Sequence, residues 1–115
     1  MATVPMVLEQ ASPNAGVDNT MYTVPLKTRV TITALVVANR SPVAETYRVW
    51  IAKGGAVTVN RQYIRYDKAI AGNDDHTIRN LTLGPGDQIR VRSGGGNLSF
   101  NLFGFQIDGW LEGQV

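Results

Sequence analysis

The chain has no cysteine and a single histidine, His76, among its 115 residues. Without cysteine it can form neither a disulfide framework nor a thiolate metal site. A lone histidine close to a turn is far more often a surface residue than a catalyst. Its acidic neighbours, Asp74 and Asp75, are adjacent in the chain, where successive side chains of an extended segment point to opposite faces. We therefore expect a non-enzymatic protein with no metal site and no cofactor.

Charge and long apolar runs are also scarce. Charged residues make up 17% of the chain, and the longest unbroken apolar run spans residues 34–38. That run is far shorter than the roughly 20 residues that cross a bilayer as a helix. The N-terminal residues lack the basic start and continuous apolar stretch of a signal peptide. We therefore expect a soluble single domain with no membrane partner and no export signal.

Arginine dominates the basic residues, with eight arginines against three lysines and a formal net charge of +2. Its planar guanidinium suits multidentate contacts at protein interfaces as well as phosphate binding. Five arginines fall on predicted strands close to aromatic residues, at Arg48, Arg61, Arg65, Arg90 and Arg92. A nucleic-acid groove with stacking aromatics is therefore an alternative. Because the net charge is small and acidic residues are interspersed, we favour a solvated or protein-facing surface and expect no nucleic-acid partner.

Short pieces between glycines and prolines carry apolar residues at every second position, which predicts strands. In residues 28–34, Val30, Ile32 and Ala34 share one face. The continuation to residue 38 is apolar throughout, which indicates a central strand covered on both faces. Residues 46–52 also alternate, and this places Trp50 on the outer face of its strand.

Later segments complete an all-β pattern. Residues 76–83 and 88–92 flank a Gly-Pro-Gly-Asp turn, which predicts a hairpin. Within residues 97–107 the apolar alternation slips by one residue at Phe103–Gly104, so we expect a β-bulge there or a change of buried face. No segment has the period of a helix. The sequence therefore predicts an antiparallel β-sandwich of about seven or eight strands.

The two ends of the chain carry apolar side chains without strand or helix periodicity. We therefore expect an extended N-terminal arm over residues 1–19, a sandwich domain over 20–107 and a C-terminal tail over 108–115. Apolar arms of this kind suit contacts with neighbouring subunits. The candidate partner-binding residues are Val4, Met6, Val7, Leu8, Arg48, Trp50, Arg90, Arg92, Trp110 and Leu111.

Three runs in the first half of the chain resemble a group of small virion-associated proteins of tailed bacteriophages. They are YTVPLKT at residues 22–28, LVVANRS at 35–41 and TYRV at 46–49. Further matches are IAGND at 70–74, LGPGDQIRV at 83–91 and LSFNLFG at 98–104. The resemblance covers about residues 20–107. One departure is PLK at residues 25–27, where the family commonly carries Pro-Ala-Gly-Lys, so the turn here is shorter.

The resemblance implies a virion structural protein and no catalytic or metal residues. We expect a capsid decoration or cement protein that binds the major capsid protein, with a tail, neck or baseplate position as the alternative. Such a protein would reside in the virion after assembly in the host cytoplasm. We also expect a homo-oligomer, with a trimer favoured, because closed symmetric assemblies match the symmetry of a shell or tail. Trp50 and Trp110 leave a carbohydrate-binding sandwich module as an alternative of another class.

Overall fold

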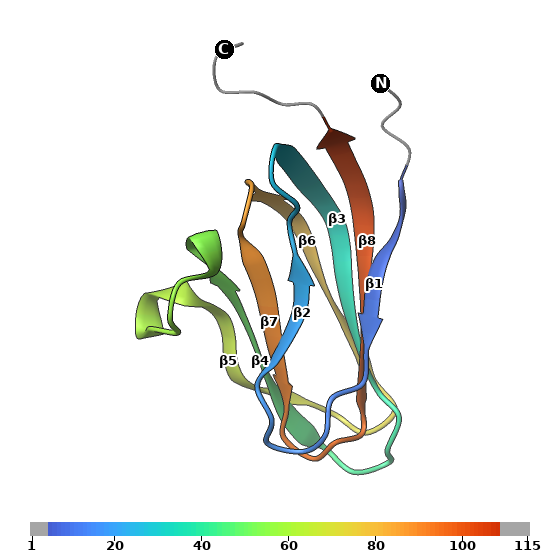
Figure 1. Ribbon diagram of the computed structural model, residues 1–115. Helices are drawn as coiled ribbons and strands as arrows, with labels where there is room; N and C mark the ends of the chain where they lie inside the picture. The colour runs from blue at the N-terminus through green and yellow to red at the C-terminus, as the bar shows by residue number, and fades with distance from the viewer. Residues whose placement is uncertain (1–4, 109–115) are drawn as a thin grey trace.

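Two four-stranded antiparallel sheets pack face to face in this computed structural model, which describes residues 5–108 (Figure 1). Sheet A has the order β1 (Met6–Ala11), β8 (Leu98–Asp108), β3 (Thr28–Asn39) and β6 (Asp75–Leu83). Sheet B has the order β2 (Asn19–Thr23), β7 (Gln88–Ser93), β4 (Glu45–Ala52) and β5 (Tyr63–Ile70). The predicted all-β sandwich is confirmed.

The strand pairing follows one rule, in which the first strand pairs with the last and the others pair inward from there. β1 pairs with β8, β2 with β7, β3 with β6 and β4 with β5, all antiparallel. The chain is thus one long hairpin rolled up so that successive pairs alternate between the two sheets. This is the topology of a jelly roll, in which eight strands form two packed sheets.

The rolled hairpin accounts for a difference from the sequence prediction. The segments flanking the turn at Gly84–Asp87 do not form a hairpin, because β6 lies in sheet A and β7 in sheet B. Among the described strands, β4 and β5 are the only consecutive pair that share a sheet as neighbours. Their connection, residues 53–62, is therefore the tip of the long hairpin and is called the tip loop below. It contains two short 3-10 turns, η1 (Lys53–Gly55) and η2 (Asn60–Gln62).

The core lies between the sheets and is built by alternation. Val30, Ile32, Leu35 and Val37 of β3 are fully buried. β3 pairs with both β8 and β6, so the prediction that it is an interior strand is confirmed. The expected covering of both faces is wrong, because the outward Val36 and Ala38 are only partly buried and no further sheet of residues 5–108 lies outside sheet A. Phe100 of β8 contacts sheet B across the core, where its ring meets that of Tyr47 edge-on at 6.3 Å between centroids.

The slip in alternation at Phe103–Gly104 reflects a change of the apolar face. Leu98, Phe100 and Leu102 point into the core, and the inward positions that follow are Gly104 and Gln106. The side-chain nitrogen of Gln106 donates to the hydroxyl of Tyr22 across the sandwich at 2.6 Å. The predicted irregularity lies on the flanking strands, where β3 has an extra residue between Ile32 and Ala34 and β1 between Val7 and Glu9. The same irregularity turns Ala34 away from the face that Val30 and Ile32 share.

The N-terminal arm expected over residues 1–19 differs from the structure. Residues 6–11 form β1, and β2 already begins at Asn19. β1 is an edge strand with a bulge, so Met6, Val7 and Leu8 follow one another without the alternation that reveals a strand. At the other end, β8 continues to Asp108. No helix within residues 5–108 is long and apolar enough to span a membrane.

Candidate docking surfaces

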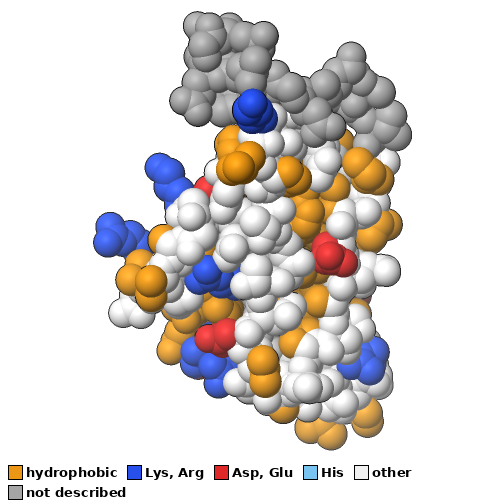
Figure 2. Space-filling model, viewed as in Figure 1, with side chains coloured by type: hydrophobic (Ala, Val, Ile, Leu, Met, Phe, Trp, Pro, Cys, Tyr) orange, Lys and Arg blue, Asp and Glu red, His pale blue; other side chains and the backbone are white. Residues whose placement is uncertain are grey.

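The outward side of β8 carries no charge along its whole length. Its side chains are Ser99, Asn101, Phe103, Phe105 and Ile107. Phe103 pairs with Val7 of β1, whose side chain is 51% exposed. Figure 2 shows apolar side chains at the edge of the molecule where Figure 1 draws β1. We call Val7, Phe103, Phe105 and Ile107 the β8 outer face.

The N-terminal candidates divide between surface and core. Met6 and Val7 are each about half exposed, whereas Leu8 packs against the buried core. Leu8 therefore contributes to the core of the sandwich and is less available to a partner than Met6 and Val7. Val4, Trp110 and Leu111 lie outside the described residues.

Two of the three candidate arginines on sheet B face each other across neighbouring strands and are held by separate carboxylates. Arg48 of β4 lies opposite Arg92 of β7. Arg48 donates to both carboxylate oxygens of Asp67, at 2.7 and 3.3 Å, and its guanidinium lies 4.2 Å from the ring centre of Tyr66. Arg92 donates to Asp18 at 3.1 Å. Because like charges opposite each other repel, these carboxylates stabilise the arrangement. The sheet therefore presents paired charges and no continuous basic stripe here.

The contact between Arg48 and Asp67 predicts a measurable shift in the pKa of Asp67. The hydrogen bond from Arg48 lowers the pKa of Asp67 from its ordinary value of 3.8, with smaller contributions from the charges of Arg48 and Arg92. A depressed carboxyl pKa stabilises the fold above the unfolded pKa, and this contribution is lost as pH falls below about 4 through the folded pKa. An NMR titration should place the pKa of Asp67 below 3.8 and return it toward that value in Arg48→Gln. An unchanged pKa in this variant would contradict the assignment, and Arg40→Gln serves as the control.

Trp50 lies on the outer side of its strand, as the alternation predicts, but it is fully buried. Its indole N–H donates to the hydroxyl of Thr58 in the tip loop at 3.0 Å, and its ring lies 5.2 Å from that of Tyr63. The tip loop thus covers the ring. The expectation that Trp50 forms an accessible partner-binding or glycan-binding platform is therefore incorrect for this fold.

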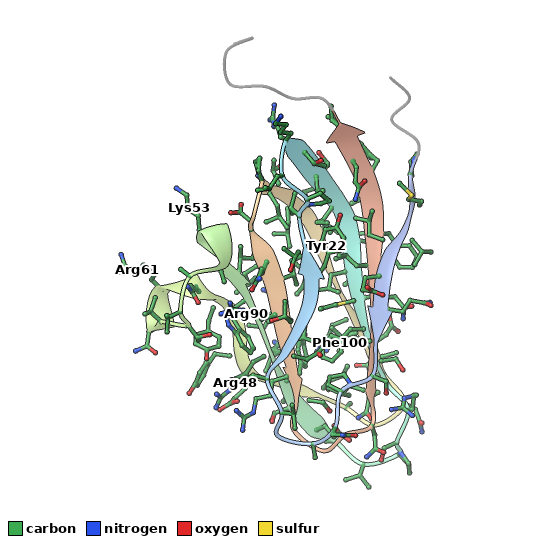
Figure 3. All side chains as sticks on the ribbon, viewed as in Figure 1. Tyr22, Arg48, Lys53, Arg61, Arg90 and Phe100 are labelled. Atoms are coloured by element: carbon green, nitrogen blue, oxygen red, sulfur yellow. The ribbon has the colours of Figure 1, made fainter. Side chains whose placement is uncertain are left out.

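Arg90 holds the tip loop against the sheet. Its guanidinium donates to the carbonyl oxygens of Ala56 and Gly55, at 3.0 and 3.3 Å, and to the hydroxyl of Thr58 at 3.1 Å. Two further donations go to the side-chain oxygen of Gln88. Since these bonds occupy its donors, Arg90 positions a loop and is not the free partner contact that the sequence suggested. Figure 3 shows Arg90 and Arg48 against the body of the sandwich, whereas Lys53 and Arg61 project from the tip loop.

Removing the Arg90 guanidinium should loosen the tip loop without unfolding the sandwich. A hydrogen bond to a charged group is worth about 1.5–3 kcal/mol, so Arg90→Met should raise the rate of tryptic cleavage after Lys53 and Arg61 at least about tenfold. The rate is measured by mass spectrometry of the full chain under native conditions. Arg92→Met, which removes a bond to Asp18 only, is the matched control. Equal cleavage rates in the two variants would contradict the role of Arg90.

Other side chains fix the remaining backbone of the tip loop. The Gln62 amide donates to the carbonyl oxygen of Val57 and accepts from the N–H of Val59, at 3.0 and 3.2 Å. The carboxylate of Asp87 accepts from the N–H of Gly54 at 2.8 Å. The loop is therefore held in one conformation by Trp50 of β4, by Arg90 of β7 and Asp87 just before it, and by its own Gln62.

A groove of about 660 Å³ lies beside the tip loop. Its apolar lining comes from Ile51, Ala56, Val57 and Val59, and its polar lining from Lys53, Arg61 and Gln62. Val57 is 83% exposed and Val59 is 42% exposed. Sequence reasoning missed this groove because the segment has no periodicity. The available signal was the pair of valines in a glycine-containing connection.

His76 contributes to the fold through Tyr47. Its Nδ1 atom accepts or donates a hydrogen bond with the Tyr47 hydroxyl at 2.8 Å, according to the tautomer. Burial raises the pKa of Tyr47, against a smaller opposing contribution from Arg65. Within residues 5–108, no group of three or more histidine, cysteine, aspartate or glutamate side chains could hold a metal ion.

The open edge between β5 and β6 carries a second, basic hollow of about 570 Å³. Arg65 and Lys68 line it because β5 has an extra residue between them, which brings both side chains to the same face. Asp75, His76 and Thr77 of β6 line the other side. Charges that point inward from an edge strand discourage pairing with another sheet.

Comparisons of the chain with protein-family models, with curated proteins and with solved structures found no match. The fold defines it as an eight-stranded β-sandwich with the strand order of a jelly roll.

Proposed function

We propose that this chain is a non-enzymatic structural protein of a tailed-phage particle, and specifically a capsid decoration protein that binds and stabilises the assembled shell. The observation that carries this proposal is the β8 outer face. It places Val7, Phe103, Phe105 and Ile107 on one side of a sheet whose outward β8 positions are uncharged. A partly apolar strip of sheet surface is suited to burial against another protein, and Arg29, which pairs with Ile107 at its end, adds a charge to its border.

Two further observations support the proposal. The resemblance to small virion proteins of tailed phages covers about residues 20–107, which includes seven of the eight strands almost completely. Jelly rolls occur in viral capsid proteins and also in lectins, so the topology is compatible with the role and does not by itself select it.

The mechanism of a decoration protein is mass action. Apolar surface buried between the chain and the shell contributes roughly 25 cal/mol per Å². Because the chain binds assembled subunits and not separated ones, its binding energy adds to the stability of the shell. A tail, neck or baseplate position would use the same face, and the major capsid protein is the partner we favour.

The position in the particle is tested by imaging. Antibody-gold labelling of particles of the phage that encodes the chain should decorate the head surface, with copies arranged over the shell. Gold confined to the tail or neck would replace the decoration role by the alternative position. Particles without label would contradict the virion role itself.

The docking face is tested by a matched pair of variants. Val7→Lys places a charge in the β8 outer face and should weaken binding to purified particles that lack the chain at least about tenfold in Kd, as measured by co-sedimentation. Val17→Lys is the control, because Val17 is 49% exposed and lies outside this face. Equal binding by the two variants would overturn the assignment of the face.

A further inference from the structure

We propose that the groove of the tip loop receives residues 109–115 of a second copy of this chain. The groove is a separate surface from the β8 outer face, so this inference does not depend on the phage role. It concerns how copies of the chain bind one another.

The groove is formed in the single chain, without any partner. Arg90, Gln62, Asp87 and Thr58 fix the backbone of the loop through the hydrogen bonds described above. Because the loop is fixed, the side chains of Val57 and Val59 remain exposed to water, and burying them against a ligand would be favourable. A preformed site also loses little conformational entropy on binding. The groove is therefore suited to a ligand with apolar side chains.

The groove is positively charged. Lys53 and Arg61 line the groove and make no ion pair with any side chain in residues 5–108. No acidic side chain of residues 5–108 lines the groove. Both cations project into solvent from the tip loop (Figure 3), and Figure 2 shows basic side chains at the same edge of the molecule. The ligand that complements this site is therefore an apolar segment with negative charge.

The composition of the chain beyond β8 matches the groove. Residues 109–115 read GWLEGQV, with Trp110, Leu111 and Val115 as apolar side chains, Glu112 as the only charge, and no basic residue. Residues 1–4 read MATV and carry no side-chain charge. Of the two segments outside the described residues, only the C-terminal one matches both properties of the groove.

The short distance between β8 and Trp110 favours a second copy over the same chain as the source of the tail. Trp110 is two residues beyond Asp108, a chain length of at most about 7 Å. β8 lies in sheet A and the tip loop joins two strands of sheet B (Figure 1). Packed sheets are already about 10 Å apart, so the main chain at Trp110 stays on the sheet A side of its own molecule, whereas a second copy can bring this large side chain to the groove. Residues 111–115 extend further, and the paired cysteines at 57 and 111 described below distinguish the two cases. A tail-to-groove contact joins two different surfaces, and such heterologous contacts close into rings when the rotation allows.

Disulfide trapping tests the contact directly, because the natural chain has no cysteine. Full-length Val57→Cys and full-length Leu111→Cys, with tags of different mass, are mixed and oxidised mildly. We expect a mixed disulfide dimer that forms at least tenfold faster than with Val43→Cys in place of Val57→Cys. Val43 is 67% exposed and lies in the turn between β3 and β4, so it is an accessible control outside the groove.

The results distinguish docking between two copies from docking within one chain, and both from the phage role. Trapping at Val57 no faster than at Val43 would overturn the proposal. A double variant with cysteines at both 57 and 111 that yields only an internal disulfide at every protein concentration would also overturn it, in favour of docking within one chain. If particles fail to bind the chain while trapping succeeds, only the phage role is lost.

Charge reversal gives a second, independent measurement. Lys53→Glu with Arg61→Glu should weaken self-association by at least tenfold in sedimentation equilibrium. Adding Glu112→Lys to these two changes should restore most of the association, because it re-creates opposite charges across the contact. Loss without restoration would contradict the pairing of Glu112 with these cations.

Discussion

Trp50→Ala is expected to lower the free energy of unfolding by about 3–5 kcal/mol, the range for removal of a fully buried large aromatic side chain. The ring is sealed between sheet B and the tip loop, so its loss leaves a cavity and removes one of the two hydrogen bonds that the Thr58 hydroxyl accepts, the other coming from Arg90. The tip loop should also become exposed to proteolysis, because Trp50 is one of its main contacts. Urea unfolding followed by far-ultraviolet circular dichroism measures the global effect.

Two comparison variants separate burial from hydrogen bonding. Trp50→Phe keeps an aromatic ring but removes the indole donor, and we expect a loss of about 1–2 kcal/mol. Tyr66→Ala removes a neighbouring aromatic side chain that is 57% exposed, and the loss should stay below about 1 kcal/mol. A Trp50→Ala loss no larger than that of Tyr66→Ala would show that the ring does not contribute as a core residue.

Gly104→Ala is expected to cost about 3 kcal/mol, because a methyl group at this position meets the backbone of β3. A Cβ atom on Gly104 would clash with the Thr31 carbonyl oxygen and lie 3.0 Å from the Ile32 Cα atom. Backbone in the middle of a sheet cannot move aside as a flexible side chain can. The strands approach this closely where β3 carries its extra residue next to Gly104.

Gly84→Ala is the matched control for this position. Its added Cβ would have the Asp87 carboxylate as its nearest neighbour, at an ordinary contact distance of 3.7 Å. We expect a change within about 0.5 kcal/mol. Thermal unfolding of both variants by calorimetry provides the comparison. Equal melting temperatures would contradict the close approach of β3 and β8.

The jelly roll separates two surfaces that serve different contacts in our proposals. The β8 outer face lies on sheet A, and the tip loop extends from the β4–β5 end of sheet B. A chain built in this way can bind a shell with one surface and a second copy of itself with the other. The variants Val7→Lys and Lys53→Glu with Arg61→Glu are therefore expected to impair separate activities.

Part of the candidate site was accessible from the sequence. The phase slip at Phe103–Gly104 indicates a bulge or a change of buried face and does not say which; the structure shows that Phe103, Phe105 and Ile107 point outward and form most of the β8 outer face. Met6 and Val7 were recognised as candidate contacts and are half exposed. The tip-loop groove was not recognised, because an irregular connection has no periodic pattern from which side-chain direction can be inferred.

The sequence by itself determined the all-β class, the shared inward face of Val30 and Ile32 in β3, and the lack of any cysteine-based chemistry. A two-residue period records on which side of its own strand a residue lies, and this information is local. Tertiary structure alone decided which strands pair, so that β6 and β7 separated into different sheets and residues 6–11 became a strand. It also decided what covers each outer face, so Trp50 is buried under the tip loop and Arg90 is occupied in holding it. Pairing partners and covering loops come from distant parts of the chain, and no local pattern contains them.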